Sequence, residues 1–168
     1  GIELSYGSDL DLVFIHDSDP NLFTDGDKQI ANSVFFTRLG QKIIHILNTF
    51  TTSGQLYEVD MRLRPSGNSG LLVSSLKAFS DYQHKEAWTW EHQALVRARV
   101  VAGDPDLKAR FESVRADILE LNREPEKLLE EVSEMREKMR QHLGSKNSEN
   151  EENPVFHLKH DRGGIVDI

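Results

Sequence analysis

Three aspartates carry the clearest chemical signal in this sequence. Asp9 and Asp11 stand two residues apart in an apolar run, and residues at this spacing on a β-strand point to the same face, roughly 7 Å apart at the backbone. Asp60, in a second strand-like segment, could supply a third carboxylate. Carboxylate oxygens suit Mg²⁺. Because the motif itself contains no histidine or cysteine, Zn²⁺ is the poorer candidate.

Such a carboxylate set suits chemistry at phosphorus. Around two metal ions, it would support an in-line attack in which one ion lowers the pKa of the attacking hydroxyl and the other bridges phosphate oxygens and the leaving group. Asp60 would be the natural base. Taken alone, an Asp-x-Asp pair near a strand end is more often a solvated edge or a turn. A catalytic role for Asp9 and Asp11 therefore needs support from the residues around Asp60.

Two arginines follow Asp60 at strand spacing. The exposed face of this segment reads Glu58, Asp60, Arg62 and Arg64, while the alternate positions are apolar. Guanidinium groups next to a carboxylate–metal site could neutralise a triphosphate by bidentate contacts. The alternative is that both arginines pair with Glu58 and Asp60 as ordinary surface ion pairs.

The charge of the chain excludes a general polyanion-binding surface. The 168 residues include 28 acidic and 20 basic ones, a net charge of −8. Residues 1–60 and 112–168 are acidic and residues 61–111 are basic, so the sign changes next to Asp60. No cysteine, long apolar run or secretory leader is visible, which is compatible with the cytoplasmic location that we expect. A chain from Gly1 to Ile168 also reads as a fragment of a longer one.

Apolar periodicity predicts the elements that would position these side chains. A strand is expected over Leu10–Ile15, a long amphipathic helix over about Asp27–Phe50, and a second strand over Tyr57–Leu63. A turn at 66–70 then leads to a short third strand, Leu71–Ser74, which would pair with the second as a hairpin.

The rest of the sequence is predicted to be mainly helical. Helices are expected over Leu76–Tyr82, Ala87–Ala102, 105–121 and 125–143. Gly103 would end the second of these, and Asp104-Pro105 would form the N-cap and first turn of the third. This order predicts an α+β fold in which a small mixed sheet precedes a helical extension.

The expected domain organisation follows from the order of these elements. Residues 1–75 would form a catalytic core and residues 76–143 a helical extension of the same domain. Residues 144–168 would form a polar loop and the start of a further region.

Several motifs resemble known families. Gly7-Ser8-Asp9-Leu10-Asp11-Leu12 and Val59-Asp60-Met61 resemble the Ser-Asp-x-Asp and hydrophobic-Asp-hydrophobic motifs of the polymerase-β-like nucleotidyltransferases. A closer resemblance, to the bacterial bifunctional glutamine synthetase adenylyltransferase/adenylyl-removing enzymes, rests on four further segments. These are the runs from Glu58 to Gly67, from Trp88 to Leu95, from Arg97 to Asp104 and from Gly163 to Ile168.

The resemblance implies a function and assigns roles. One domain of these enzymes transfers AMP from ATP to a tyrosine of glutamine synthetase and so regulates nitrogen assimilation, and a similar domain removes the AMP by phosphorolysis. The motifs of this chain look more like those of the C-terminal, adenylylating domain. Asp9, Asp11 and Asp60 then become catalytic metal ligands, and Ser8, Arg62 and Arg64 become nucleotide contacts. Mg²⁺, ATP, glutamine synthetase and the PII signal protein are implied as cofactor, substrate and partners, with no nucleic acid or membrane.

Two alternatives stay open. The chain could be the adenylyl-removing domain, or a regulatory module that senses nucleotide or glutamine and docks a partner without catalysis. The presence of all three aspartates speaks against the second alternative. The Gly-Gly pair that opens the family's motif is represented by Gly1 alone, so this fragment is expected to bind nucleotide less well than its parent.

Overall fold

The computed structural model describes residues 8–19, 21–55, 57–146 and 155–167. It forms two compact units, Gly1–Leu121 and Asn122–Ile168. Four short strands and four of the five helices of the described residues belong to the first unit. The predicted α+β class is therefore confirmed. None of the described helices is both long and apolar enough to cross a membrane.

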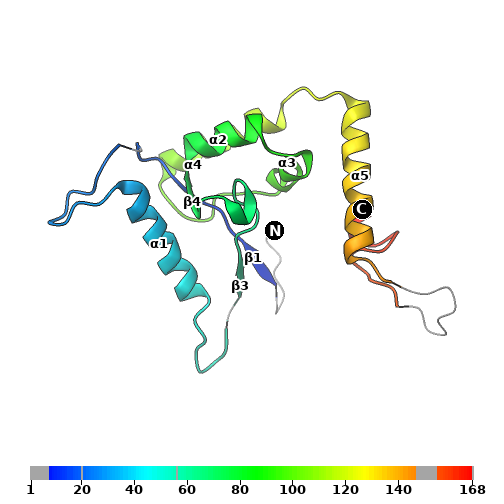
Figure 1. The fold of residues 1–168 in the computed structure, drawn as a ribbon, viewed down its shortest axis with the longest axis horizontal. Helices are drawn as coiled ribbons and strands as arrows, with labels where there is room; N and C mark the ends of the chain where they lie inside the picture. The colour runs from blue at the N-terminus through cyan, green and yellow to red at the C-terminus, as the bar shows by residue number, and fades with distance from the viewer. Residues whose placement is uncertain (1–7, 20, 56, 147–154, 168) are drawn as a thin grey trace. The chain divides into compact units, whose positions relative to one another are not determined.

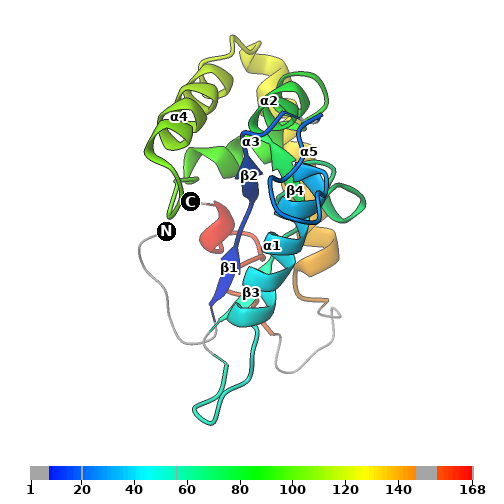
Figure 2. The same ribbon diagram turned by 90° about the vertical axis from the view of Figure 1, so that its left-hand side faces the viewer.

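The first predicted strand is divided in two. Strands β1 (Asp9–Asp11) and β2 (Phe14–His16) follow one another along the chain, and Figure 2 shows them end to end. Strand β3 (Glu58–Asp60) pairs in parallel with β1, and β4 (Val73–Ser75) pairs in parallel with β2. One extended segment thus serves two partners, one beside each half.

The predicted hairpin between the second and third strands is wrong. β3 and β4 are each parallel to the same segment, 9–16, so they run in the same direction, whereas the strands of a hairpin run in opposite directions. The strand expected over Tyr57–Leu63 ends at Asp60. Beyond it, turns and a short 3₁₀ helix, Gly67–Ser69, carry the chain onward to β4.

Helix α1 (Asn32–Leu47) is shorter than the predicted Asp27–Phe50. The chain before it closes a loop, because the Thr24 N–H donates to the Ile30 carbonyl at 2.9 Å. Gly40 is buried within the helix, and a Cβ there would lie 2.8 Å from Val73 Cγ2. The absence of a side chain at this position therefore lets α1 pack directly against β4.

The core of the first unit lies under helices α2 (Leu76–Lys85), α3 (Thr89–Val96) and α4 (Pro105–Leu119). Its buried cluster consists of Phe79, Leu95 and Ile118, one from each helix. Residues of β2 and the segment before it pack against this cluster. The helices thereby cover the β2–β4 pair with apolar surface, which is the main stabilising contribution here.

Side-chain caps set the helix boundaries. Asp104 Oδ1 accepts from the backbone N–H groups of residues 106 and 107 at 2.9 and 3.0 Å, which confirms it as the N-cap of α4. The helix predicted to reach Ala102 ends at Val96 instead, and Gly103 does not cap it. Arg115 from α4 donates to the carbonyls of Leu95 and Val96 at 2.7 and 2.8 Å, and so satisfies the groups that a C-cap would serve.

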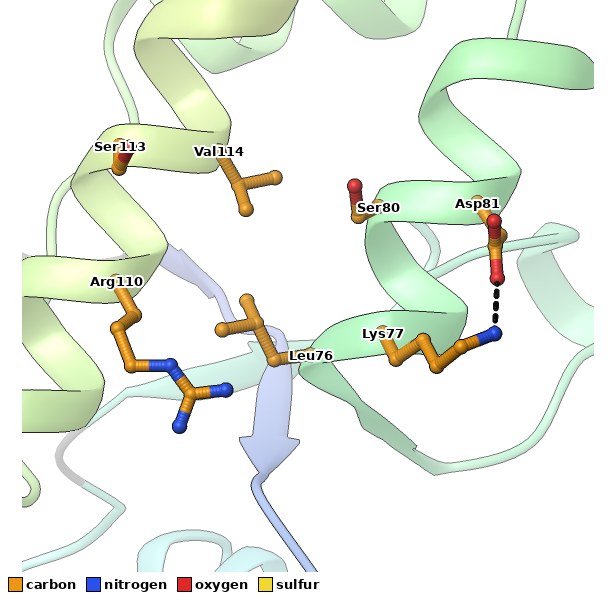
Figure 3. A pocket seen from close by; sticks show the side chains of 7 residues that line it. All are labelled: Leu76, Lys77, Ser80, Asp81, Arg110, Ser113 and Val114. Atoms are coloured by element: carbon orange, nitrogen blue, oxygen red, sulfur yellow. Dashed lines mark hydrogen bonds and ion pairs between the residues drawn. The ribbon is translucent and has the colours of Figure 1, made fainter.

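An open groove of about 360 Å³ lies between α2 and α4 (Figure 3). Its lining residues are Leu76, Lys77, Ser80, Asp81, Arg110, Ser113 and Val114. Lys77 pairs with Asp81 at 3.0 Å, and Arg110 forms two hydrogen bonds to the carboxylate of Asp17. Both cations of the groove are therefore neutralised by neighbouring residues.

The second unit is helix α5 with the segment that follows it. The helix spans Pro125–Leu143, as predicted. Arg136 Nη2 donates to the His160 carbonyl at 3.0 Å and ties the segment to the helix. Hydrogen bonds to Asp161 from the Ser145 hydroxyl and from two backbone N–H groups lower its pKa to about 2. Of the predicted polar loop at 144–153, residues 147–153 lie outside the described residues.

We predict that Phe79→Ala will lower the free energy of unfolding by about 3–5 kcal/mol, because it empties the centre of the core and leaves a cavity. Leu71→Ala is the control, since Leu71 is 76% exposed, and it should cost less than about 0.5 kcal/mol. Thermal and urea denaturation of the two variants checks this. Equal losses would mean that the core lies elsewhere.

Candidate functional site

The pairing of β1 with β3 brings the predicted carboxylates together on one face. Asp9 stands opposite Glu58, and Asp11 stands opposite Asp60. Residues two apart on a strand, and partners in register across a parallel pair, share a face. Four carboxylates therefore lie on one face of two adjacent strands. Asp9 and Asp11 are exposed, and Asp60 is half-buried.

Arg62 binds the carboxylate of Asp60. Asp60 Oδ1 accepts from the Arg62 backbone N–H at 2.8 Å, and Oδ2 accepts from Nε at 2.7 Å and pairs with Nη2. The side-chain hydrogen bond to Arg62, together with its charge, lowers the pKa of Asp60. The sequence left two arrangements open for Arg62: a contact to a bound triphosphate, or an ion pair with a neighbouring carboxylate. The structure shows the ion pair, with Asp60.

The other aspartates also act on Arg62. The hydrogen bond and charge of Asp60 raise the pKa of its guanidinium, and the negative charges of Asp11 and Asp9 raise it further. The face of β1 and β3 is thus negative enough to hold a cation, and Arg62 is the cation that the structure places there.

The chemistry of the donor set fits Mg²⁺, which prefers carboxylate oxygens. Asp9, Asp11 and Asp60 offer only such oxygens, all from one face. Within the described ranges, however, no three acidic or histidine side chains converge closely enough to enclose an ion. Arg62 holds both oxygens of Asp60 in this arrangement.

Arg64 braces the turn after β3, and its positive charge helps to lower the pKa of Asp60. Its Nη1 donates to the Met61 carbonyl at 2.7 Å, and its Nε lies 3.4 Å from the Gly70 carbonyl. It forms no ion pair with Glu58 or Asp60 within the described residues, in contrast to Arg62. Ser8, the remaining predicted contact, directly precedes β1 and so lies next to Asp9.

The turn at 61–70 is tightly constrained. A Cβ on Gly70 would lie 1.8 Å from the Pro65 carbonyl oxygen, so only glycine fits there. Ser66 has a φ of 58°, in the left-handed region, which costs a residue with a side chain about 1–2 kcal/mol. A conformation of this cost needs support from the surrounding structure.

A buried polar network lies between α2 and α3. The Tyr82 hydroxyl donates to Glu91 Oε1 at 2.9 Å, and Glu91 Oε2 accepts from the Trp88 backbone N–H at 2.9 Å. Glu91 is only 8% exposed. The network thereby joins α2 to the start of α3.

Sequence reasoning did not assign a role to Tyr82 or Glu91. The available signal was the glutamate within the run Trp88-Thr89-Trp90-Glu91-His92, because a charged residue amid aromatic ones is unusual unless it is partnered. The partner on α2 could not be read from the sequence, since nothing local links the two helices.

A family model and individual relatives of this chain name the same kind of enzyme. The family model for glutamate-ammonia ligase adenylyltransferase matches residues 1–114. Over its whole length, the chain is 66% identical to a protein of Hahella chejuensis and 61% identical to one of Pseudomonas aeruginosa. Both relatives are named bifunctional glutamine synthetase adenylyltransferase/adenylyl-removing enzyme. The chain spans 17% and 18% of their respective lengths.

We predict that Arg62→Gln will raise the pKa of Asp60 toward its ordinary value of 3.8, because the hydrogen bond that lowers it is weakened and the charge is removed. Since the folded-state pKa is depressed, the pair stabilises the fold above the ordinary pKa, and this contribution is lost as the pH falls through the folded value. Carboxyl titration by NMR measures it. Arg99→Gln, which changes an exposed arginine, is the control. An unchanged Asp60 titration in Arg62→Gln would contradict the observed pair.

Proposed function

Because the chain belongs to the glutamate-ammonia ligase adenylyltransferase family, we propose that it is part of a nucleotidyltransferase domain that transfers AMP from ATP to a tyrosine of glutamine synthetase. The observation that carries the proposal is the register that places Asp9, Asp11 and Asp60 on one face. Such a site would regulate nitrogen assimilation in the cytoplasm.

In the proposed reaction, the tyrosine oxygen attacks the α-phosphorus of ATP. A new oxygen–phosphorus bond forms, the bond between the α-phosphorus and the bridging oxygen breaks, and pyrophosphate leaves. The tyrosine proton goes to a carboxylate oxygen of Asp60. For this, Arg62 exchanges Asp60 for phosphate oxygens, which a guanidinium binds in the same bidentate manner as a carboxylate.

The remaining site residues bind and orient. Ser8 next to Asp9 would donate its hydroxyl proton to a phosphate oxygen. Arg64 acts through the turn that it braces, by keeping Arg62 within reach of Asp60. Asp9, Asp11 and Asp60 are the residues that would hold Mg²⁺, which supplies positive charge for activating the attacking hydroxyl and neutralising the phosphates.

The partners are part of the same proposal. Glutamine synthetase is the protein substrate in the names of the relatives, and the family resemblance adds the PII signal protein as a regulator. The motif Tyr6-Gly7-Ser8-Asp9-Leu10-Asp11 and the run from Trp88 to His92 support the adenylylating over the adenylyl-removing domain.

We predict that Asp60→Asn in the full-length protein will lower AMP transfer to glutamine synthetase at least about 100-fold, because it removes both the base and a metal ligand. Incorporation of labelled AMP from Mg-ATP measures the rate. Asp81→Asn is the matched control, since Asp81 pairs only with surface lysines, and it should keep wild-type activity. Substantial transfer by Asp60→Asn would exclude these roles.

The same variant separates the two reactions of the family. Supplied with adenylylated glutamine synthetase and phosphate, the Asp60→Asn protein should still release ADP, because that reaction belongs to the other domain. Loss of ADP release with transfer retained would assign this chain to the adenylyl-removing domain. If the Asp60→Asn protein transfers AMP and releases ADP at the same rates as the wild type, the chain is a docking module.

A further inference from the structure

Helix α1 has an outer side that the described part of the first unit leaves open. Gly40 marks its inner side, where a Cβ would lie 2.8 Å from Val73 Cγ2. On the outer side, an apolar row consists of Phe35, Leu39 and Ile46, which follow one another at i, i+4 and i+11. These side chains are 42%, 42% and 65% exposed. In Figure 1, α1 also stands apart from the group of α2, α3 and α4.

The first member of the apolar row is held in place. The ring of Phe35 packs edge-to-face against that of Phe36, with 5.4 Å between the ring centroids. Phe36 in turn stacks on His16, the last residue of β2, at 4.7 Å. Because His16 is only 8% exposed, this stack ties Phe35 to the interior of the unit. A large aromatic side chain that is both fixed and open to solvent suits the centre of a protein interface.

A basic row runs beside the apolar one. Arg38, Lys42 and His45 follow one another at i, i+4 and i+7, and all three are exposed. The helix contains no acidic residue, although residues 1–60 as a whole contain nine acidic and three basic ones. Neither Arg38 nor Lys42 forms an ion pair with another described residue. The positive charge of this side is therefore open to an acidic partner.

The apolar row calls for a permanent occupant. Neighbouring large apolar side chains on a surface mark an interaction site or an aggregation liability. A protein substrate would leave the row exposed after each turnover, whereas a segment of the same polypeptide covers it throughout. Two copies joined symmetrically through α1 would place the basic rows against each other, and this repulsion disfavours such a dimer.

We propose that an acidic, amphipathic segment of the same polypeptide, outside residues 1–168, packs on the outer side of α1. Its apolar side chains cover the apolar row, and its acidic residues pair with Arg38 and Lys42. The relatives are long enough to supply such a segment, because this chain spans only 17% and 18% of their length. Packing on α1 involves no AMP transfer, so it is independent of the proposed function.

Photo-cross-linking in the full-length protein tests this contact directly. Ile46→p-benzoylphenylalanine places a photoreactive ketone in the apolar row, where irradiation joins it to the C–H group that it touches. We expect a link within one polypeptide, and mass spectrometry of the digested protein should place its other end in an acidic segment outside residues 1–168. A link from position 46 to any other site, or no link, would overturn the proposal.

The same replacement at Val101 is the matched control for position. Val101 is 72% exposed but lies in the loop between α3 and α4, away from the apolar row. We expect the Val101 variant to form no link to the segment that position 46 reaches. The same link from both positions would show that the segment has no preference for α1, and would overturn the proposal.

A charge reversal tests the acidic character of the occupant. In the Ile46 variant, Lys42→Glu should lower the yield of the link at least about threefold, because it sets a carboxylate against acidic residues. Lys28→Glu is the matched control, since it reverses an exposed lysine outside α1, and it should leave the yield unchanged. Should Lys42→Glu unfold, as judged by circular dichroism, Lys42→Gln serves in the same comparison. Equal yields in the Lys42 and Lys28 variants would contradict an acidic occupant.

Other occupants are tested by addition to the same reaction. Glutamine synthetase and vesicles of phosphatidylglycerol are added to separate samples of the Ile46 variant before irradiation. We expect the link within the polypeptide to form at unchanged yield in both. A link to the synthetase, to lipid or to a second copy in its place would identify a different occupant and overturn the proposal. Since irradiation needs neither ATP nor transfer, failure of the proposed function would leave these results unaffected.

Discussion

The register between β1 and β3 is the constraint on which the candidate site depends. It places Asp11 directly opposite Asp60, and a slip of one residue would move Asp60 to the other face and leave Asp9 and Asp11 without it. The Leu12 N–H extends the ladder by donating to the Asp60 carbonyl at 2.9 Å. Packing of α1 against the strands, permitted by the absence of a side chain at Gly40, stabilises the arrangement from one face.

Carboxylates gathered on one face repel one another and need a cation. The chain supplies one locally, because the turn after β3 returns Arg62 to Asp60. The same turn is braced by Arg64. Under the proposed function, a guanidinium that exchanges a carboxylate for phosphate oxygens would give this site a resting state and a nucleotide-binding state.

Local patterns predicted the parts of this structure that are determined locally. The spacing of Asp9 and Asp11, the N-cap at Asp104 and the start of α5 at Pro125 each involve residues within one turn or strand. The hairpin prediction failed because the partner of β4 lies almost 60 residues away in the sequence. The alternation through Arg64 suggested a longer strand, but β3 ends at Asp60, where the Arg62 backbone N–H turns back to donate to Asp60 Oδ1.

The most direct measurement is the structure of the full-length protein with Mg²⁺ and a non-hydrolysable ATP analogue. We predict metal bound by Asp9, Asp11 and Asp60, with Arg62 moved from Asp60 to the phosphates. Phosphates bound away from this strand face, with Arg62 still paired to Asp60, would contradict it.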